Sequence, residues 1–293
     1  MAEAKPKAAL GALGALETLV MNDTYSLDIA FLLDATGSMA NAIEGVKDHI
    51  QKTVNGVREQ YPQCAVRVGV VAYRDFDITE PPNGIEVLDF TSDIEAFKTF
   101  LANLEARGGD DEAEDVLSGL QKCTKLSWEA NARAVIHIAD AACHGRLFHT
   151  DRVHDKYLDV DPNGTETKEA LTNLLSEDAC NVNTYQFFHL NKSTKPMIQA
   201  FKDLVKNKTS SFLEDDLQNN DDMPDRFIHS SIHSIHRSAR RRPRPHPHPI
   251  PSPFGDPAGS PGMETPFLTR CDPPVVSPPS GTPGACPSTP GCD

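Results

Sequence analysis

The sequence has no apolar run that approaches the roughly 20 residues a membrane-spanning helix needs, which argues against a transmembrane segment. It has no C-x-x-C pair either, and its seven cysteines are widely spaced. An odd number of scattered cysteines is typical of reduced thiols in a cytosolic protein and not of a disulfide framework. The N-terminal stretch lacks a convincing signal-peptide cleavage site. We therefore expect a cytoplasmic protein, with an extracellular location as the alternative.

Phosphate-binding glycine motifs are missing as well: there is no glycine-rich loop followed by lysine and no dinucleotide fingerprint. Basic residues are in the minority, and the formal net charge of −14 would repel a nucleic acid. One basic run, residues 237–244, opposes this trend. It could make a weak contact with an anionic surface or serve as a nuclear signal. We expect no nucleic-acid partner.

Proline is scarce in most of the chain, since only six of the 23 prolines precede Pro224. From residue 211 the sequence turns acidic and polar, then basic, and finally rich in Pro, Gly, Ser and Thr. Such a composition buries too little apolar surface to offset chain entropy. We expect a flexible segment over 1–25, one domain over 26–210 and a disordered, proline-rich tail over 211–293.

Short apolar runs alternate with helical patterns across residues 26–210. After the run Leu27–Leu33, apolar residues recur every three or four positions from Met39 to Val57, which is the period of a helix. Strands are expected at 27–33, 65–73, 133–140 and 182–190, with an edge or hairpin strand at 85–90. Further helices are expected at 92–106, capped by Ser92, at 167–178 and at 195–206. The acidic segment GGDDEAEDVLSGL (108–120) is expected to open another helix. This order predicts an α/β fold, with a doubly wound, mostly parallel central sheet and helices on both faces.

Two of the apolar runs end in aspartate, at Asp34 and Asp140. Ligands bind beyond the carboxyl ends of the strands in an open α/β sheet, so both carboxylates are placed at the binding edge. Asp34 opens a D-x-T-x-S motif, whose hydroxyls on Thr36 and Ser38 could face the same point. Hard oxygen ligands of this kind select Mg²⁺, Mn²⁺ or Ca²⁺. The alternative is structural: Asp34 or Ser38 as a helix cap and Asp140 as a turn residue.

Four motifs together resemble a known family: DATGSM (34–39), AYRDFD (72–77), GGDDEAEDVLSGL (108–120) and HIADAACHG (137–145). Their order is similar to that in the von Willebrand factor A domain, and the resemblance covers roughly residues 26–210. The local motifs are most similar to the A domains that occur with atypical alpha-kinases of protists and fungi and in related stand-alone proteins.

The resemblance implies a metal-ion-dependent adhesion site formed by Asp34, Thr36, Ser38 and Asp140. The threonine that the family carries in its second loop is replaced by an acid, which we place at Asp111, with Asp110 as the alternative. A third carboxylate would neutralise a divalent cation within the chain. We therefore expect the ion to be held more tightly and to attract an acidic ligand less strongly.

The function that the resemblance implies is non-enzymatic, divalent-cation-dependent binding of a protein partner through an acidic side chain. The first alternative is a regulatory relative of alpha-kinase proteins that lacks the kinase. A metal-dependent hydrolase is the second alternative, and it is disfavoured because no general base within reach of a substrate can be identified.

Other chemically capable residues near these motifs have plainer interpretations. Cys143 and His144 are adjacent in sequence, a spacing that does not suit a nucleophile and its base, so we expect His144 to support the site and not to catalyse. His137 falls inside a strand and is expected to be a core histidine. Asp75 and Asp77 are expected to be solvated loop residues. Three further acids are expected to be helix-start residues: Glu112, Glu114 and Asp115.

Overall fold

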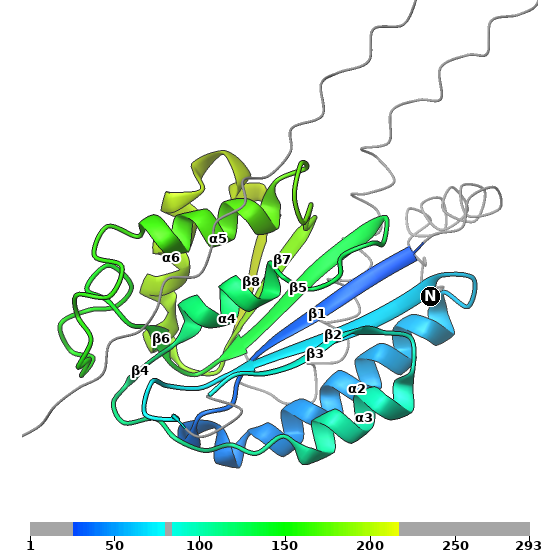
Figure 1. Cartoon of the computed structure of the whole chain (residues 1–293), viewed down its shortest axis with the longest axis horizontal. Coiled ribbons are helices and arrows are strands. Elements are labelled where there is room, and N and C mark those ends of the chain that lie inside the picture. The colour runs from blue at the N-terminus through cyan, green and yellow to red at the C-terminus, as the bar shows by residue number, and fades with distance from the viewer. Residues whose placement is uncertain (1–25, 80–83, 217–293) are drawn as a thin grey trace, which may run out of the picture. The chain divides into compact units, whose positions relative to one another are not determined.

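The computed structural model describes residues 26–79 and 84–216 (Figure 1). The predicted flexible segment 1–25, the basic run 237–244 and the proline-rich part of the predicted tail lie outside the described residues. Within those two ranges, no helix is long and apolar enough to cross a membrane.

A six-stranded sheet forms the centre of the domain, in the order β3-β2-β1-β5-β7-β8. Every neighbouring pair is parallel except β2 and β3, which are antiparallel. The prediction of a mostly parallel sheet with an edge strand near residue 85 is therefore confirmed. The strands are β1 (Ser26–Asp34), β2 (Ala65–Tyr73), β3 (Glu86–Thr91), β5 (Ala132–Ala139), β7 (Thr184–His189) and β8 (Phe212–Asp216).

Helices cover both faces of this sheet (Figure 1). On one face lie α2 (Ile43–Gln60) and α3 (Ile94–Asn103), and on the other lie α4 (Val116–Cys123), α5 (Thr165–Leu175) and α6 (Lys195–Leu204). Short 3₁₀ turns η1 (Gly37–Asn41), η2 (Lys192–Thr194) and η3 (Lys206–Ser211) complete the connections. The central strand β1 is buried on both sides, because its alternate side chains enter two separate apolar clusters, one under each helical layer.

The structure corrects three details of the predicted elements. Asp93, and not Ser92, caps α3, because its side chain accepts hydrogen bonds from the amides of Glu95 and Ala96. The acidic loop after Gly109 does not open a helix at once; it first forms the two-residue strand β4 (Ala113–Glu114), which pairs with β6 (Ala142–Cys143). A further strand, β8, lies beyond residue 210, where the sequence had predicted the end of regular structure.

The amino-terminal end of β1 is held by a buried ion pair. Asp28 is fully buried, and both of its carboxylate oxygens accept hydrogen bonds from the Arg67 guanidinium at 2.8 Å. The backbone amides of Glu129 and Ala130 add two more hydrogen bonds at 2.9 Å. The carboxylate is thus fully satisfied, and it joins β1, β2 and the segment before β5.

We predict that Asp28→Ala lowers the free energy of unfolding by about 3–5 kcal/mol, because it leaves the Arg67 guanidinium without its buried partner. Glu129→Ala removes the second carboxylate partner of Arg67. The Glu129 side chain is 74 % exposed, so this change should cost less than about 1 kcal/mol. Urea unfolding of both variants measures the difference. Equal losses would contradict the assignment of Asp28 as the anchor.

Candidate metal centre

Hydrogen bonds connect four of the five residues that the sequence predicts as metal ligands. The Thr36 hydroxyl donates to Asp34 Oδ1 at 2.6 Å, and the Thr36 amide donates to the same oxygen at 3.0 Å. Thr36 Oγ1 lies 3.1 Å from Ser38 Oγ, which in turn donates to Asp140 Oδ1 at 2.9 Å. Because β1 and β5 are parallel neighbours, their carboxyl ends bring Asp34 and Asp140 to the same edge of the sheet. The four side chains form one continuous cluster.

Hydrogen bonds hold the backbone of the first loop, residues 34–38, against the second loop, residues 108–114. The Gly37 amide donates to the Gly108 carbonyl at 2.9 Å, and the Arg107 amide donates to the Ala35 carbonyl at 3.0 Å. A Cβ atom at Gly37 would lie 2.8 Å from the Gly108 carbonyl oxygen, which is too close for any other residue. Glycine at this position of the DATGS motif therefore lets the two loops meet.

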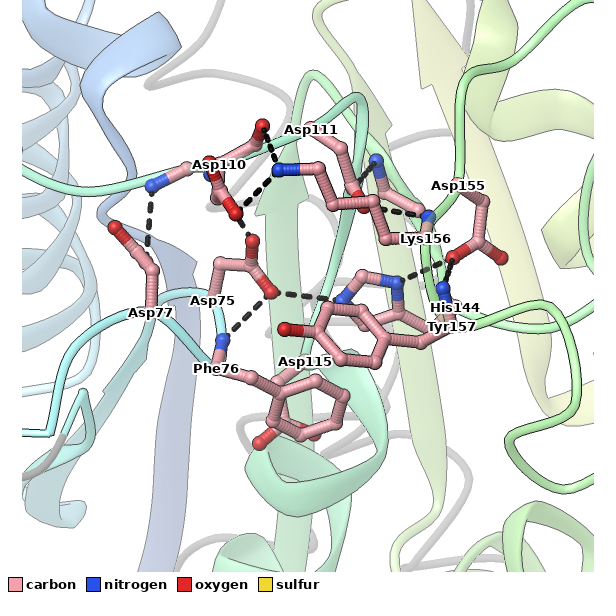
Figure 2. A network of polar contacts seen from close by, with 12 residues as sticks. Asp75, Phe76, Asp77, Asp110, Asp111, Asp115, His144, Asp155, Lys156 and Tyr157 are labelled. Carbon is pink, nitrogen blue, oxygen red and sulfur yellow. Dashed lines mark hydrogen bonds and ion pairs between the residues drawn. The ribbon is translucent and has the colours of Figure 1, made fainter.

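Asp111, the fifth predicted ligand, has different contacts. Its Oδ1 accepts a hydrogen bond from the Ala113 amide at 2.9 Å, and its Oδ2 accepts one from the Lys156 amide at 2.7 Å. Figure 2 shows it beside the Asp75 and His144 side chains. Ligand atoms of these three residues lie within 4.8 Å of one another. The neighbouring candidate, Asp110, forms an ion pair with Lys156.

Glu114 is an acid of the second loop that sequence reasoning assigned to a helix start. It lies in β4 and is 2 % exposed. Asp115 is the residue that caps α4, through a hydrogen bond from the Ser118 amide at 3.0 Å. No sequence pattern distinguishes the strand position of Glu114 from the capping role of Asp115, because a two-residue strand is too short to show periodicity.

Burial and electrostatic repulsion disfavour the charged forms of the Asp34 and Glu114 carboxylates. Burial, followed by the charge of Asp140, raises the pKa of Asp34 to about 7. Burial, followed by the charges of Asp34 and Asp75, raises the pKa of Glu114 to about 10. One oxygen on each carboxylate, Asp34 Oδ2 and Glu114 Oε2, is buried and accepts no hydrogen bond within the described structure. A bound cation would reverse both effects, so the donor set fits a divalent metal ion.

A cleft of about 510 Å³ opens beside the cluster, and we call it the edge cleft. Acidic, hydroxyl and amide side chains line it together with two basic side chains, those of Arg152 and Lys192. Its polar lining residues are Ser38, Asp111, Glu112, Glu114, Asp140, Thr150, Arg152, Asn191, Lys192 and Ser193.

A family model for the von Willebrand factor A domain matches residues 28–214, which is more than half of the chain. The chain belongs to the von Willebrand factor A domain family. It is also 35% identical over 190 residues to the alpha-protein kinase vwkA of Dictyostelium discoideum. That match covers 63% of this chain but only 29% of the kinase, so this A domain corresponds to less than a third of that protein.

Solved structures agree on the fold. The pilus adhesin SpaC from Lactobacillus rhamnosus GG matches 73% of this chain and 31% of its own, with a TM-score of 0.51 and 14% identity. A point variant of the PilB minor pilin from Streptococcus sanguinis matches 76% of this chain and 64% of its own, with a TM-score of 0.50 and 10% identity. At such low identity these likenesses show the A-domain fold alone.

A buried histidine anchors the long connection that follows β6 in this A domain (Figure 2). His144 Nε2 lies 2.7 Å from Asp75 Oδ1, and its Nδ1 lies 2.9 Å from Asp155 Oδ1. Its ring stacks on Phe76 at 4.8 Å, and Tyr157 packs against it edge-on. The network ties the AYRDFD loop to residues 144–157, so His144 positions the loops around the site.

Two sequence interpretations in this region are borne out by the contacts. The Cys143 thiol is 1 % exposed, and burial raises its pKa, so it is a poor nucleophile. His137 lies in the core between the hydroxyls of Tyr73 and Tyr185, at 2.9 and 2.8 Å. Burial lowers the pKa of His137 to about 3, which keeps its ring neutral.

The two carboxylates determine the charge of the His144 ring. Burial alone would lower the pKa of His144, but hydrogen bonds to Asp75 and Asp155 raise it above its ordinary value. Burial opposes ionisation of Asp155, yet hydrogen bonds from Gly145, His149 and His144 lower its pKa to about 2. The pKa of Asp75 is also lowered, by hydrogen bonds that overcome its burial. The network therefore stabilises the fold most between the ordinary pKa of aspartate, about 3.9, and that of histidine, about 6.5.

We predict that His144→Gln lowers the free energy of unfolding by about 1–3 kcal/mol near pH 5.5, and by less near pH 9. The contribution of a histidine with a raised pKa is lost as the pH rises through that pKa, because a neutral ring donates only one N–H. Urea unfolding at the two pH values measures the effect. His154→Gln, at an exposed histidine of the same loop, is the control. A loss that is the same at both pH values would contradict a cationic His144.

Proposed function

We propose that this A domain binds a divalent cation, Mg²⁺ or otherwise Mn²⁺ or Ca²⁺, at the carboxyl edge of its sheet and uses that edge to bind a protein partner. The side chains of Asp34, Thr36, Ser38 and Asp140 would hold the ion. They supply carboxylate and hydroxyl oxygens, which are the ligands that these hard cations prefer.

The observation that carries the proposal is the environment of the Asp34 carboxylate. This side chain is fully buried, and its Oδ2 has no hydrogen-bond donor among the described residues. A buried carboxylate without a partner on one oxygen costs free energy in an ordinary structural role. The same oxygen gains a favourable partner when a cation binds next to it.

The bound cation would offset the repulsion between Asp34 and Asp140. It would also take over the oxygens of Thr36 and Ser38, whose hydrogen bonds now connect the two carboxylates. These four side chains belong to two separate segments of the chain. Binding of the ion would therefore stabilise the first loop against the end of β5.

The edge cleft supports an acidic group as the feature of the partner that is recognised. Two basic side chains, those of Lys192 and Arg152, line the cleft together with the carboxylates. An aspartate or glutamate of the partner could form an ion pair with one of these two basic side chains. Electrostatic complementarity of this kind favours both specificity and a fast association rate.

Binding fits the site better than catalysis. The buried Cys143 thiol is not activated, and both ring nitrogens of His144 are engaged by carboxylates. The four cysteines among the described residues have free thiols, which supports a reducing, cytoplasmic location.

A second candidate function is regulation of an alpha-kinase by this A domain. The likeness to part of the vwkA kinase favours this candidate. Stable co-purification of the chain with an alpha-kinase from the same cells would distinguish it from a general adhesion role.

We predict that Mg²⁺ or Mn²⁺ raises the melting temperature of the wild-type chain and that chelator reverses the rise. An ion at about 100 times its dissociation constant adds about 2.7 kcal/mol, or roughly 5–10 °C for a domain of this size. Asp34→Asn should abolish the shift, because it removes the buried charge that the ion neutralises. Differential scanning calorimetry with Mg²⁺, Mn²⁺, Ca²⁺ and chelator makes the measurement.

Asp178→Asn is the matched control for this experiment. Asp178 is exposed and precedes β7, so it lies toward the amino-terminal edge of the sheet. Its metal-induced shift should equal that of the wild type. Partners captured in Mg²⁺ should be released by chelator and should not bind the Asp34→Asn variant. A metal response that survives Asp34→Asn would refute the proposed site.

A further inference from the structure

Glu114 lies at the carboxyl edge of the sheet because β4 pairs with β6. The pairing aligns Glu114 with Cys143, three residues beyond Asp140, and the Glu114 carbonyl accepts a hydrogen bond from the His144 amide at 3.2 Å. The backbone of Glu114 is therefore fixed next to the end of β5. Its side chain is 2 % exposed and lines the edge cleft with Ser38 and Asp140.

A glycine brings the Glu114 carboxylate close to the first loop. A Cβ atom at Gly109 would lie 3.2 Å from Glu114 Oε1 and 3.6 Å from Thr36 Cβ. Gly109 also has a φ of +95°, a backbone conformation that side chains disfavour. The space that its missing side chain leaves is thus shared by the carboxylate of Glu114 and the side chain of Thr36.

The unpaired oxygen of Glu114 distinguishes it from the other acids of the second loop. Its Oε2 is buried and accepts no hydrogen bond within the described structure, as is also true of Asp34 Oδ2. Both oxygens of Asp111 instead accept backbone amides, those of Ala113 and Lys156. Asp111 is thereby occupied in holding the second loop against the connection after β6.

We propose that Glu114, and not Asp111, supplies the carboxylate of the second loop to the divalent cation. This inference rests on the proposed metal site and specifies its third charged ligand. The carboxylates of Asp34, Glu114 and Asp140 together outweigh the charge of a divalent ion. The chain therefore neutralises the ion by itself, and no acidic group of a partner is needed for the ion to bind. Asp111 is a positioning residue in this arrangement.

The test is Mn²⁺ binding to the full chain in the absence of any partner, measured from the EPR signal of the free ion. Glu114→Gln keeps the size of the side chain and removes its charge. We expect it to weaken Mn²⁺ binding by about tenfold or more, since even residues outside the ligand set change metal affinity by 10–100-fold. Asp111→Asn should lower the melting temperature and change Mn²⁺ affinity by less than about twofold.

The metal-free melting temperature separates loss of a ligand from loss of the fold. Glu114→Gln should melt at or above the wild-type temperature, because a neutral amide replaces a buried carboxylate without a donor. If that variant does not fold, Glu114→Asp, which keeps the charge but is one methylene shorter, should weaken Mn²⁺ binding to a similar extent. Asp178→Asn again serves as the distant control.

The outcomes distinguish this inference from the proposed function. If the wild type binds Mn²⁺ and Asp34→Asn does not, the site stands. Unchanged affinity in Glu114→Gln with a loss in Asp111→Asn would then overturn the role of Glu114 alone. If the wild-type chain binds no Mn²⁺, the proposed site fails, and the ligand role of Glu114 fails with it.

Discussion

Negative charge that is buried at one edge of the sheet is the constraint on which the arrangement of this domain depends. Asp34 and Glu114 are removed from water, and Asp140 lies beside them. Carboxylates in such a position must be neutralised by a proton or by a cation. The raised pKa values of Asp34 and Glu114 favour neutralisation by a proton, and the proposed metal site would provide neutralisation by a cation. The hydroxyls of the first loop and Gly109 of the second allow these groups to approach one another.

The central strand carries a second buried aspartate at its other end, and the contrast between the two is informative. Asp28 is satisfied on both oxygens by a guanidinium and two amides, so it needs nothing further and joins parts of the fold. Asp34 accepts hydrogen bonds at Oδ1, from Thr36, while its Oδ2 accepts none from the described residues. Burial is the same, but only Asp34 has an oxygen that accepts no hydrogen bond from the described residues.

The loops around the site form one connected unit. The His144 ring joins Asp75 to Asp155, and Asp111 holds the Lys156 amide. The Gly108 carbonyl accepts a hydrogen bond from the Gly37 amide, so the second loop contacts both the first loop and the connection after β6. Arg152, which lines the edge cleft, belongs to that connection. Under the proposed function, a few hydrogen bonds would connect the bound cation to the surface where a partner binds.

The amino-acid sequence by itself determined the α/β class, the main strands and the helical layers, because apolar periodicity reports which faces are buried. It also placed Asp34 and Asp140 at a common edge, since neighbouring parallel strands end on the same side. Only the tertiary structure decided the short pairing of β4 with β6, the last strand β8, and the different positions of Asp111 and Glu114. Pairing of such short segments depends on contacts between residues far apart in the chain, and local sequence patterns do not predict those contacts.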